Sequence, residues 1–159
     1  MLMTKYLIMD VDGTLTDGKI YVGGKGELMK AFNIKDGYGI AYILPQLGIA
    51  PVIITGRSSE IVTQRCRELN IKFCFQGVKD KLLTLKDFVS QQGVSLAECA
   101  YIGDDLNDMP CMKAIKDAGG LVACPSDAAE QVRKYADHIT ASNGGGGAVR
   151  DFIDNCLIK

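Results

Sequence analysis

Short apolar runs alternate with longer amphipathic segments along the chain. The apolar runs have the length of β-strands and lie at residues 5–9, 50–54, 73–75, 99–102 and 121–123, with 138–140 as a short edge strand. The amphipathic segments predict helices at 38–47, 59–69, 79–92, 106–118, 128–135 and 149–156. Alternating strands and helices are typical of a parallel sheet covered on both faces. The pattern therefore predicts the α/β class, with a Rossmann-like three-layer α/β/α sandwich around a mostly parallel central sheet.

Two segments depart from this alternation. Residues 17–33 place short β-prone pieces on either side of Gly23-Gly24-Lys25-Gly26, which predicts a β-hairpin flap above the end of the first strand. Residues 143–159 begin with an asparagine and four glycines and end in the last predicted helix. Glycine is costly to order, so the run is either a flexible linker or a place where the backbone approaches another group closely. Ser126 and Asp127 are candidate N-caps for the helix at 128–135.

Length and composition narrow the class of protein. The 159 residues favour a single domain over 1–159, and the net charge of −1 gives no sign of binding to nucleic acid or to a membrane. The chain shows no leader and no apolar run long enough to span a bilayer, so we expect a cytoplasmic protein. Its six cysteines fit buried thiols better than disulfides. With His138 as the single histidine, a zinc centre or a histidine-based triad is disfavoured.

Candidate chemical groups follow the predicted strands directly. Asp10 and Asp12 end the first strand, and Thr55-Gly56-Arg57 ends the second. Lys81 lies in the helix after the third strand, and Gly103-Asp104-Asp105-Leu106-Asn107-Asp108 ends the fourth. In an open α/β sheet the carboxyl ends of the strands meet at one edge, where ligands bind. We therefore expect these side chains to form one site.

The residue types predict phosphoryl chemistry. Carboxylates one residue apart repel each other unless a cation lies between them, and Mg²⁺ prefers oxygen ligands such as Asp10, Asp12 and Asp104. Thr55 and Lys81 supply a hydroxyl donor and a positive charge for phosphate oxygens. One carboxylate can then act as nucleophile and a second as general acid and base.

The same residues resemble a known family. D-x-D-G-T-L-T-D-G at 10–18, T-G-R at 55–57, Lys81 and G-D-D-L-N-D at 103–108 are similar to the four motifs of the haloacid dehalogenase superfamily. The resemblance implies Asp10 as nucleophile and Asp12 as general acid and base. It implies that Asp10, the main-chain carbonyl of Asp12, and Asp104 bind Mg²⁺, and that Thr55 and Lys81 hold the phosphoryl group. Asp105 and Asp108 would support the metal or orient Lys81; the alternative for both is a role as helix N-terminal acids.

A narrower resemblance covers nearly the whole chain. D-G-x-I-Y at 17–21, K-A-F-N-I-K-D-G-Y-G at 30–39, R-C at 65–66, Q-G-x-x-x-K at 76–81 and G-G-x-G-A-V-R at 144–150 resemble the 3-deoxy-D-manno-octulosonate 8-phosphate phosphatase subfamily. This resemblance implies a HAD-like fold without a cap domain, a small phosphorylated sugar acid as substrate, and a homotetramer joined through the hairpin. It also implies a glycine-rich tail that can reach an adjacent subunit's site. The residues implied to contact the substrate are Asn33, Ile34, Lys35, Asp36, Gly37, Gly56, Arg57 and Arg65.

Two positions depart from the subfamily pattern and keep alternatives open. Ala41 stands where related enzymes often carry a basic residue, and Gly146 where the tail often has a larger polar one. Both concern the substrate, so a nine-carbon 3-deoxy-nonulosonate 9-phosphate or a broader set of sugar phosphates is an alternative substrate. Arg57 argues against the nine-carbon acid, because the resemblance leads us to expect an acidic residue there. An alternative of another class is a non-catalytic tetrameric regulatory subunit.

Overall fold

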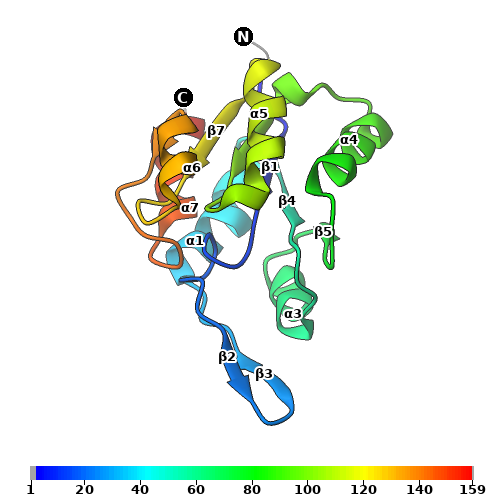
Figure 1. Ribbon diagram of the computed structural model, residues 1–159. Coiled ribbons are helices and arrows are strands. Elements are labelled where there is room, and N and C mark those ends of the chain that lie inside the picture. Colours follow the sequence, from blue (N-terminus) through cyan, green and yellow to red (C-terminus); the bar gives the residue numbers. More distant parts are fainter. Residues whose placement is uncertain (1–2, 159) are drawn as a thin grey trace.

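The computed structural model describes residues 3–158 and shows a six-stranded sheet between two layers of helices (Figure 1). The strands are β1 (Tyr6–Met9), β4 (Ala50–Ile54), β5 (Phe73–Phe75), β6 (Cys99–Ile102), β7 (Leu121–Cys124) and β8 (His138–Ile139). Their order is β5-β4-β1-β6-β7-β8, and every neighbouring pair is parallel. The sequence prediction of an α/β sandwich around a parallel sheet is confirmed.

The alternation of side chains along each strand divides the core into two. Leu7 and Met9 of β1 pack on one face of the sheet, and Ile8 packs on the other. The first face is covered by α1 (Ile34–Tyr38), α2 (Leu44–Gln46), α3 (Glu60–Glu68) and α7 (Ala148–Phe152). The second is covered by α4 (Lys81–Gln92), α5 (Met109–Asp117) and α6 (Glu130–Tyr135). Fully buried aliphatic residues on both faces of β1 make it the centre of the molecule.

The helix after the hairpin begins earlier than the sequence predicted. The predicted start at residue 38 is wrong, because α1 already begins at Ile34 and continues through π-helical residues Gly39–Ile43 into α2. Asn33 is the N-cap, and its side chain accepts a hydrogen bond of 2.8 Å from the Lys35 amide. Residues 33–37, predicted as substrate contacts, are therefore the first turn of a helix.

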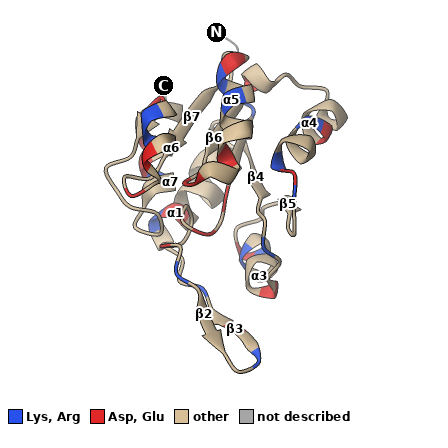
Figure 2. Cartoon of the chain, in the orientation of Figure 1, with Lys and Arg blue, Asp and Glu red and all other residues tan. Residues whose placement is uncertain are grey.

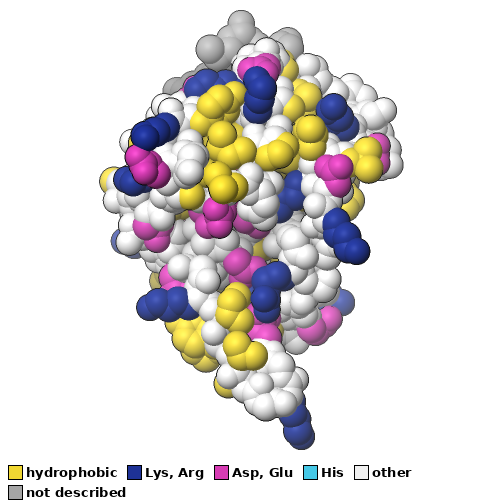
Figure 3. Space-filling view, in the orientation of Figure 1, with side chains coloured by type: hydrophobic (Ala, Val, Ile, Leu, Met, Phe, Trp, Pro, Cys, Tyr) yellow, Lys and Arg dark blue, Asp and Glu magenta, His cyan; other side chains and the backbone are white. Residues whose placement is uncertain are grey.

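The predicted hairpin forms from β2 (Tyr21–Gly23) and β3 (Gly26–Met29), which pair antiparallel. It projects from the molecule at the carboxyl ends of the sheet strands (Figure 1). Val22, Leu28 and Met29 are each more than half exposed on it. A second apolar surface, a groove of about 590 Å³, includes Leu106 and Met109 and lies along α5, where Figure 3 shows hydrophobic side chains gathered.

The glycine run is ordered and packs against the loop after β1. A Cβ on Gly144 would lie 1.9 Å from the Gly13 carbonyl oxygen, so only glycine fits this close approach. Asp127 accepts a hydrogen bond from the Gly144 amide, and the Ser126 hydroxyl donates one to Asn143. The prediction of Ser126 and Asp127 as N-caps is wrong, since α6 has Ala129 at its N-cap with no side-chain hydrogen bond.

Two findings bear on the predictions about cysteines and membrane-spanning segments. The six cysteines are free thiols, four of them buried. Among the helices of residues 3–158, none is both long enough and apolar enough to cross a membrane.

Candidate active site

A cleft of about 270 Å³ opens at the carboxyl ends of β1, β4 and β6. It is lined by Asp10, Asp12, Gly18, Thr55, Gly56, Arg57, Asp104, Asp105 and Asn107. Figure 2 shows the acidic segments that follow β1 and β6 at this edge. The structure thus brings together side chains from three of the four predicted motifs, and Lys81 reaches the same acids from the start of α4.

Lys81 bridges two buried carboxylates. Its Nζ lies 3.1 Å from Asp10 Oδ1 and 2.8 Å from Asp108 Oδ1. Burial opposes the charge of Lys81, but the two carboxylates outweigh it and raise the lysine pKa, so the ammonium persists. Tyr101 on β6 donates a 2.7 Å hydrogen bond to the same Asp108 oxygen.

Asp108 holds the loop after β6 in place. Its Oδ2 accepts hydrogen bonds from the amides of Asp104 at 2.9 Å and Asp105 at 3.2 Å. Because both oxygens of Asp108 already accept hydrogen bonds, its main effect is to fix Lys81 and the Asp104 backbone. Asp105 in turn caps the 3-10 turn that follows, through a 2.7 Å bond from the Leu106 amide. The predicted supporting role of Asp108 and the helix-terminal alternative for Asp105 both have a geometric basis here.

Asp10 and Asp104 are neighbouring acids whose pKa values are both raised, although Lys81 lies against Asp10. Burial, followed by repulsion from Asp108, raises the pKa of Asp10 to about 6 against the attraction of Lys81. Burial, followed by repulsion from Asp10, raises the pKa of Asp104 to about 8. Thr14 donates a 3.1 Å hydrogen bond to Asp104, and a Cβ on Gly13 would lie 2.0 Å from an Asp104 oxygen. The loop after β1 therefore fixes the Asp104 side chain closely.

The donor set fits a small divalent cation. Oxygens of Asp10, Asp104 and Asp108 lie within 4.8 Å of one another. Carboxylates at this spacing repel each other in a buried site, and a hard cation that takes oxygen ligands, such as Mg²⁺, relieves that repulsion. Asp10 and Asp104 are the side chains best placed to bind it, since the Asp108 oxygens are engaged elsewhere.

The Asp12 carboxylate lies outside this cluster of oxygens and pairs with Lys30. Lys30 Nζ lies 2.6 Å from Asp12 Oδ1 and 3.0 Å from Glu27 Oε2. Burial opposes the Lys30 charge, but Asp12 and Glu27 outweigh it and raise the lysine pKa. Arg57 lies at the rim, with Nε 3.9 Å from Asp12 Oδ2. Asp12 is thus the acid of the cleft that faces the hairpin, and its side chain is not among the clustered metal-binding oxygens.

Thr55 and Gly56 follow β4 in the cleft. Thr55 is buried, and its backbone is held by β5 through an amide hydrogen bond to the Phe75 carbonyl of 2.9 Å. Gly56 is exposed. Both line the cleft, where Thr55 was predicted to hold the phosphoryl group and Gly56 to contact the substrate.

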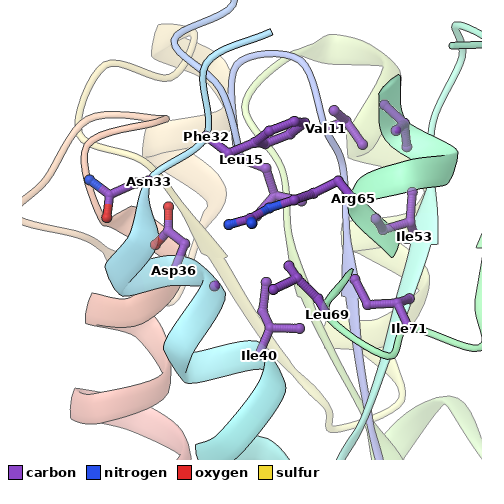
Figure 4. Close-up of a pocket in the computed structure, with 12 residues that line it drawn as sticks. Val11, Leu15, Phe32, Asn33, Asp36, Ile40, Ile53, Arg65, Leu69 and Ile71 are labelled. Carbon is purple, nitrogen blue, oxygen red and sulfur yellow. The ribbon is translucent and has the colours of Figure 1, made fainter. Parts of the chain in front are cut away.

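The other predicted substrate residues lie apart from the cleft. Asn33, Asp36, Gly37 and Arg65 line a separate, enclosed cavity of about 10 Å³, shown in Figure 4. The Arg65 guanidinium points into it and stacks over the Phe32 ring at 5.3 Å. No residue lines both spaces, because Asp10 and Asp12 face the cleft while Val11, between them, faces the cavity.

Ile34 and Lys35 are exposed on α1 and line neither space. The substrate contacts of residues 33–37 and Arg65 therefore stay a prediction within one chain.

Three residues that bind the predicted acids were not singled out from the sequence. Lys30, Thr14 and Tyr101 each bind a predicted acidic residue: Asp12, Asp104 and Asp108, respectively. Thr14 and Lys30 fall inside motifs that carry the family resemblance, which was an available signal. Tyr101 sits within an apolar strand, and nothing in the sequence marks its hydroxyl as different from that of any core tyrosine.

Fold and site together define a class, the haloacid dehalogenase-like hydrolases, whose sequence model matches residues 76–153. The 3-deoxy-D-manno-octulosonate 8-phosphate phosphatase of Escherichia coli K12 is 42% identical over 154 residues, which cover 97% of this chain and 79% of that protein. The chain therefore belongs to the family of 3-deoxy-D-manno-octulosonate 8-phosphate phosphatases.

Solved structures agree with this assignment. The Moraxella catarrhalis phosphatase of this name, in complex with a magnesium ion, a phosphate ion and a KDO molecule, is 45% identical with a TM-score of 0.84. The match covers 92% of this chain and 82% of that one. The cobalt-bound Haemophilus influenzae phosphatase is 37% identical with a TM-score of 0.88, covering 95% and 85% of the two chains.

Proposed function

We propose that this protein is a Mg²⁺-dependent phosphatase that hydrolyses 3-deoxy-D-manno-octulosonate 8-phosphate to the free sugar acid and phosphate. The observation that carries the proposal is the group formed by buried Asp10 and Lys81 and half-buried Asp104 at the carboxyl edge of the sheet. It combines a carboxylate nucleophile, a fixed positive charge and a cation site in one cleft. The similarity to relatives of that name, across 97% of the chain, supports the substrate.

The reaction we propose assigns a role to each of the predicted catalytic side chains. An Asp10 oxygen attacks phosphorus in line with the ester oxygen, and the P–O ester bond breaks to leave an aspartyl-phosphate. Asp12 gives a proton to the departing alkoxide, then takes one from the water that attacks the aspartyl-phosphate and frees Asp10. Lys81 and Thr55 hold the phosphoryl oxygens. A bound Mg²⁺ supplies neutralisation of the negative charge shared by phosphate and carboxylates.

The assembly and setting are part of the same proposal. The hairpin exposes Val22, Leu28 and Met29, and apolar side chains on a projecting flap support a homotetramer built through this contact. A cytoplasmic place in the formation of lipopolysaccharide precursors fits a phosphatase acting on this sugar acid. The nine-carbon acid, the broader substrate range and the non-catalytic subunit are the alternatives that an experiment must separate.

Steady-state kinetics on the eight-carbon and nine-carbon 3-deoxy sugar acid phosphates, with Mg²⁺ and with EDTA, test the proposal. We expect turnover that requires the metal and a kcat/KM at least about tenfold higher, or ~1.4 kcal/mol in transition-state binding, for the eight-carbon ester. A preference for the nine-carbon ester, or none, would assign another substrate. Absence of Mg²⁺-dependent turnover on any ester would favour the regulatory subunit.

A further inference from the structure

The stem of the hairpin reaches the active site through one buried lysine. Lys30 follows β3 directly, and its side chain is only 3% exposed although the hairpin itself projects into solvent. Its ammonium lies between two carboxylates, 2.6 Å from Asp12 Oδ1 and 3.0 Å from Glu27 Oε2. An ion pair buried to this degree has fixed geometry, unlike exposed pairs, which exchange with water.

Glu27 extends the contact to a second element of the fold. Its Oε1 accepts a 2.6 Å hydrogen bond from the Ser59 hydroxyl, at the N-cap of α3. Ser59 makes no side-chain cap for that helix. The hydroxyl thus holds the hairpin instead of completing the helix end, which costs some helix stability. A continuous chain of contacts runs from α3 through Glu27 and Lys30 to Asp12.

The two oxygens of Asp12 have different surroundings. Oδ1 accepts a hydrogen bond from Lys30, whereas Arg57 Nε lies 3.9 Å from Oδ2, beyond hydrogen-bonding distance. A carboxylate held through one oxygen keeps its rotamer and leaves the other oxygen free to exchange a proton. General acid and base catalysis depends on such placement, because the group must stay within hydrogen-bonding reach of the reacting atom.

We propose that Lys30 is a positioning residue that fixes Asp12 through Oδ1, so that Oδ2 is the oxygen that exchanges the proton during ester hydrolysis. This inference rests on the proposed function, in which Asp12 is the general acid and base. It assigns the hairpin stem a part in catalysis within its own chain, in addition to any contact between subunits. Lys30 does not line the cleft, so it acts through Asp12.

The test compares Lys30→Met with a matched control, Lys134→Met, whose lysine lies in an exposed pair with Glu130 on α6, away from the hairpin and the cleft. For Lys30→Met on the eight-carbon sugar acid phosphate, we expect kcat to fall at least about tenfold, and by no more than the roughly 10²–10⁴-fold that general acid–base catalysis contributes, with KM changed less than about threefold. The control should match the wild type in both. A fall in kcat without a rise in KM is the result expected of a positioning residue.

A second substrate sharpens the result. The 4-nitrophenolate ion is a stable leaving group that needs no proton, so kcat/KM for 4-nitrophenyl phosphate should fall several-fold less in Lys30→Met than kcat/KM for the sugar acid ester. A raised KM with unchanged kcat would overturn the proposal and make Lys30 a substrate contact. An equal loss on both esters would also overturn it, since a general disturbance of the site has that effect.

Folding of the variant is measured separately. Urea unfolding shows whether Lys30→Met is folded, and the double variant Lys30→Met/Glu27→Gln removes the carboxylate that the single change leaves without its lysine. The same kinetic split is expected in the double variant. Wild-type turnover with Mg²⁺ tests the proposed function on its own, so its failure is distinguishable from failure of the role given to Lys30.

Discussion

Asp36 should make the stability of the protein fall as pH rises. It is 2% exposed, and its Oδ1 accepts a 2.8 Å hydrogen bond from the Arg150 amide, while Oδ2 has no partner among the described residues. Burial raises the pKa of Asp36 from its ordinary 3.8 to about 6, against the hydrogen bonds from the Arg150 and Val149 amides. The protonated carboxyl is the form that the folded protein favours.

The size and sign of the effect follow from proton linkage. In the unfolded chain Asp36 loses its proton near pH 3.8, and in the folded protein it keeps it to about pH 6. Its contribution is therefore fully present below pH 3.8 and is lost as pH rises through 6. Because one pKa unit corresponds to about 1.36 kcal/mol, the loss between pH 3.5 and pH 7 is about 3 kcal/mol.

Urea unfolding in EDTA at a series of pH values measures this loss. Asp36→Asn keeps an acceptor oxygen and cannot titrate, so its free energy of unfolding should exceed that of the wild type by about 3 kcal/mol more at pH 7 than at pH 3.5. At a slope of roughly 2 kcal/mol per molar urea, the midpoint difference changes by about 1.5 M. Asp117→Asn, in an exposed pair with Lys113, is the control and should follow the wild type. A wild-type minus Asp36→Asn difference that is constant with pH would refute the reasoning.

Three further predictions concern the cleft. Gly13→Ala should abolish phosphate release and weaken Mg²⁺ binding in calorimetry, because its Cβ would lie 2.0 Å from an Asp104 oxygen at a backbone φ of +89°; wild-type behaviour would contradict the close packing. Asp108→Asn should lower the free energy of unfolding by about 3 kcal/mol in urea, since Lys81 loses a buried partner; a change below about 1 kcal/mol would contradict this. The rise in melting temperature caused by Mg²⁺ should be larger at pH 8 than at pH 5, because Asp10 and Asp104 hold protons to about pH 6 and 8 that the cation must displace; an equal rise would argue against these ligands.

The sequence predicted the parallel sheet well because its strands are short, apolar and separated by clear helical patterns. The helical start at Ile34 was missed because Gly37 and Gly39 lower helix propensity, and Asn33 as an N-cap was the signal that could have found it. The glycine run was left open between a linker and a close approach. Only the fold shows that Gly144 meets the Gly13 carbonyl, since the two residues are distant in sequence.

The site was predictable where a motif names the residue and unpredictable where a partner comes from another element. Asp10, Lys81 and Asp104 meet as their positions after the strands predicted. The pairing of Asp12 with Lys30 depends on where the hairpin folds back, which local patterns do not encode. The inward position of Arg65 likewise depends on how α3 packs against α1.

Phosphate release by the wild type and by Asp10→Asn, measured with Mg²⁺ on 3-deoxy-D-manno-octulosonate 8-phosphate, tests the covalent role of Asp10 most directly. The wild type should turn over, and Asp10→Asn should lose at least about 10³-fold in kcat, or ~4 kcal/mol, while its urea midpoint shows that it stays folded. A folded Asp10→Asn that releases phosphate at a rate near the wild type would contradict the account.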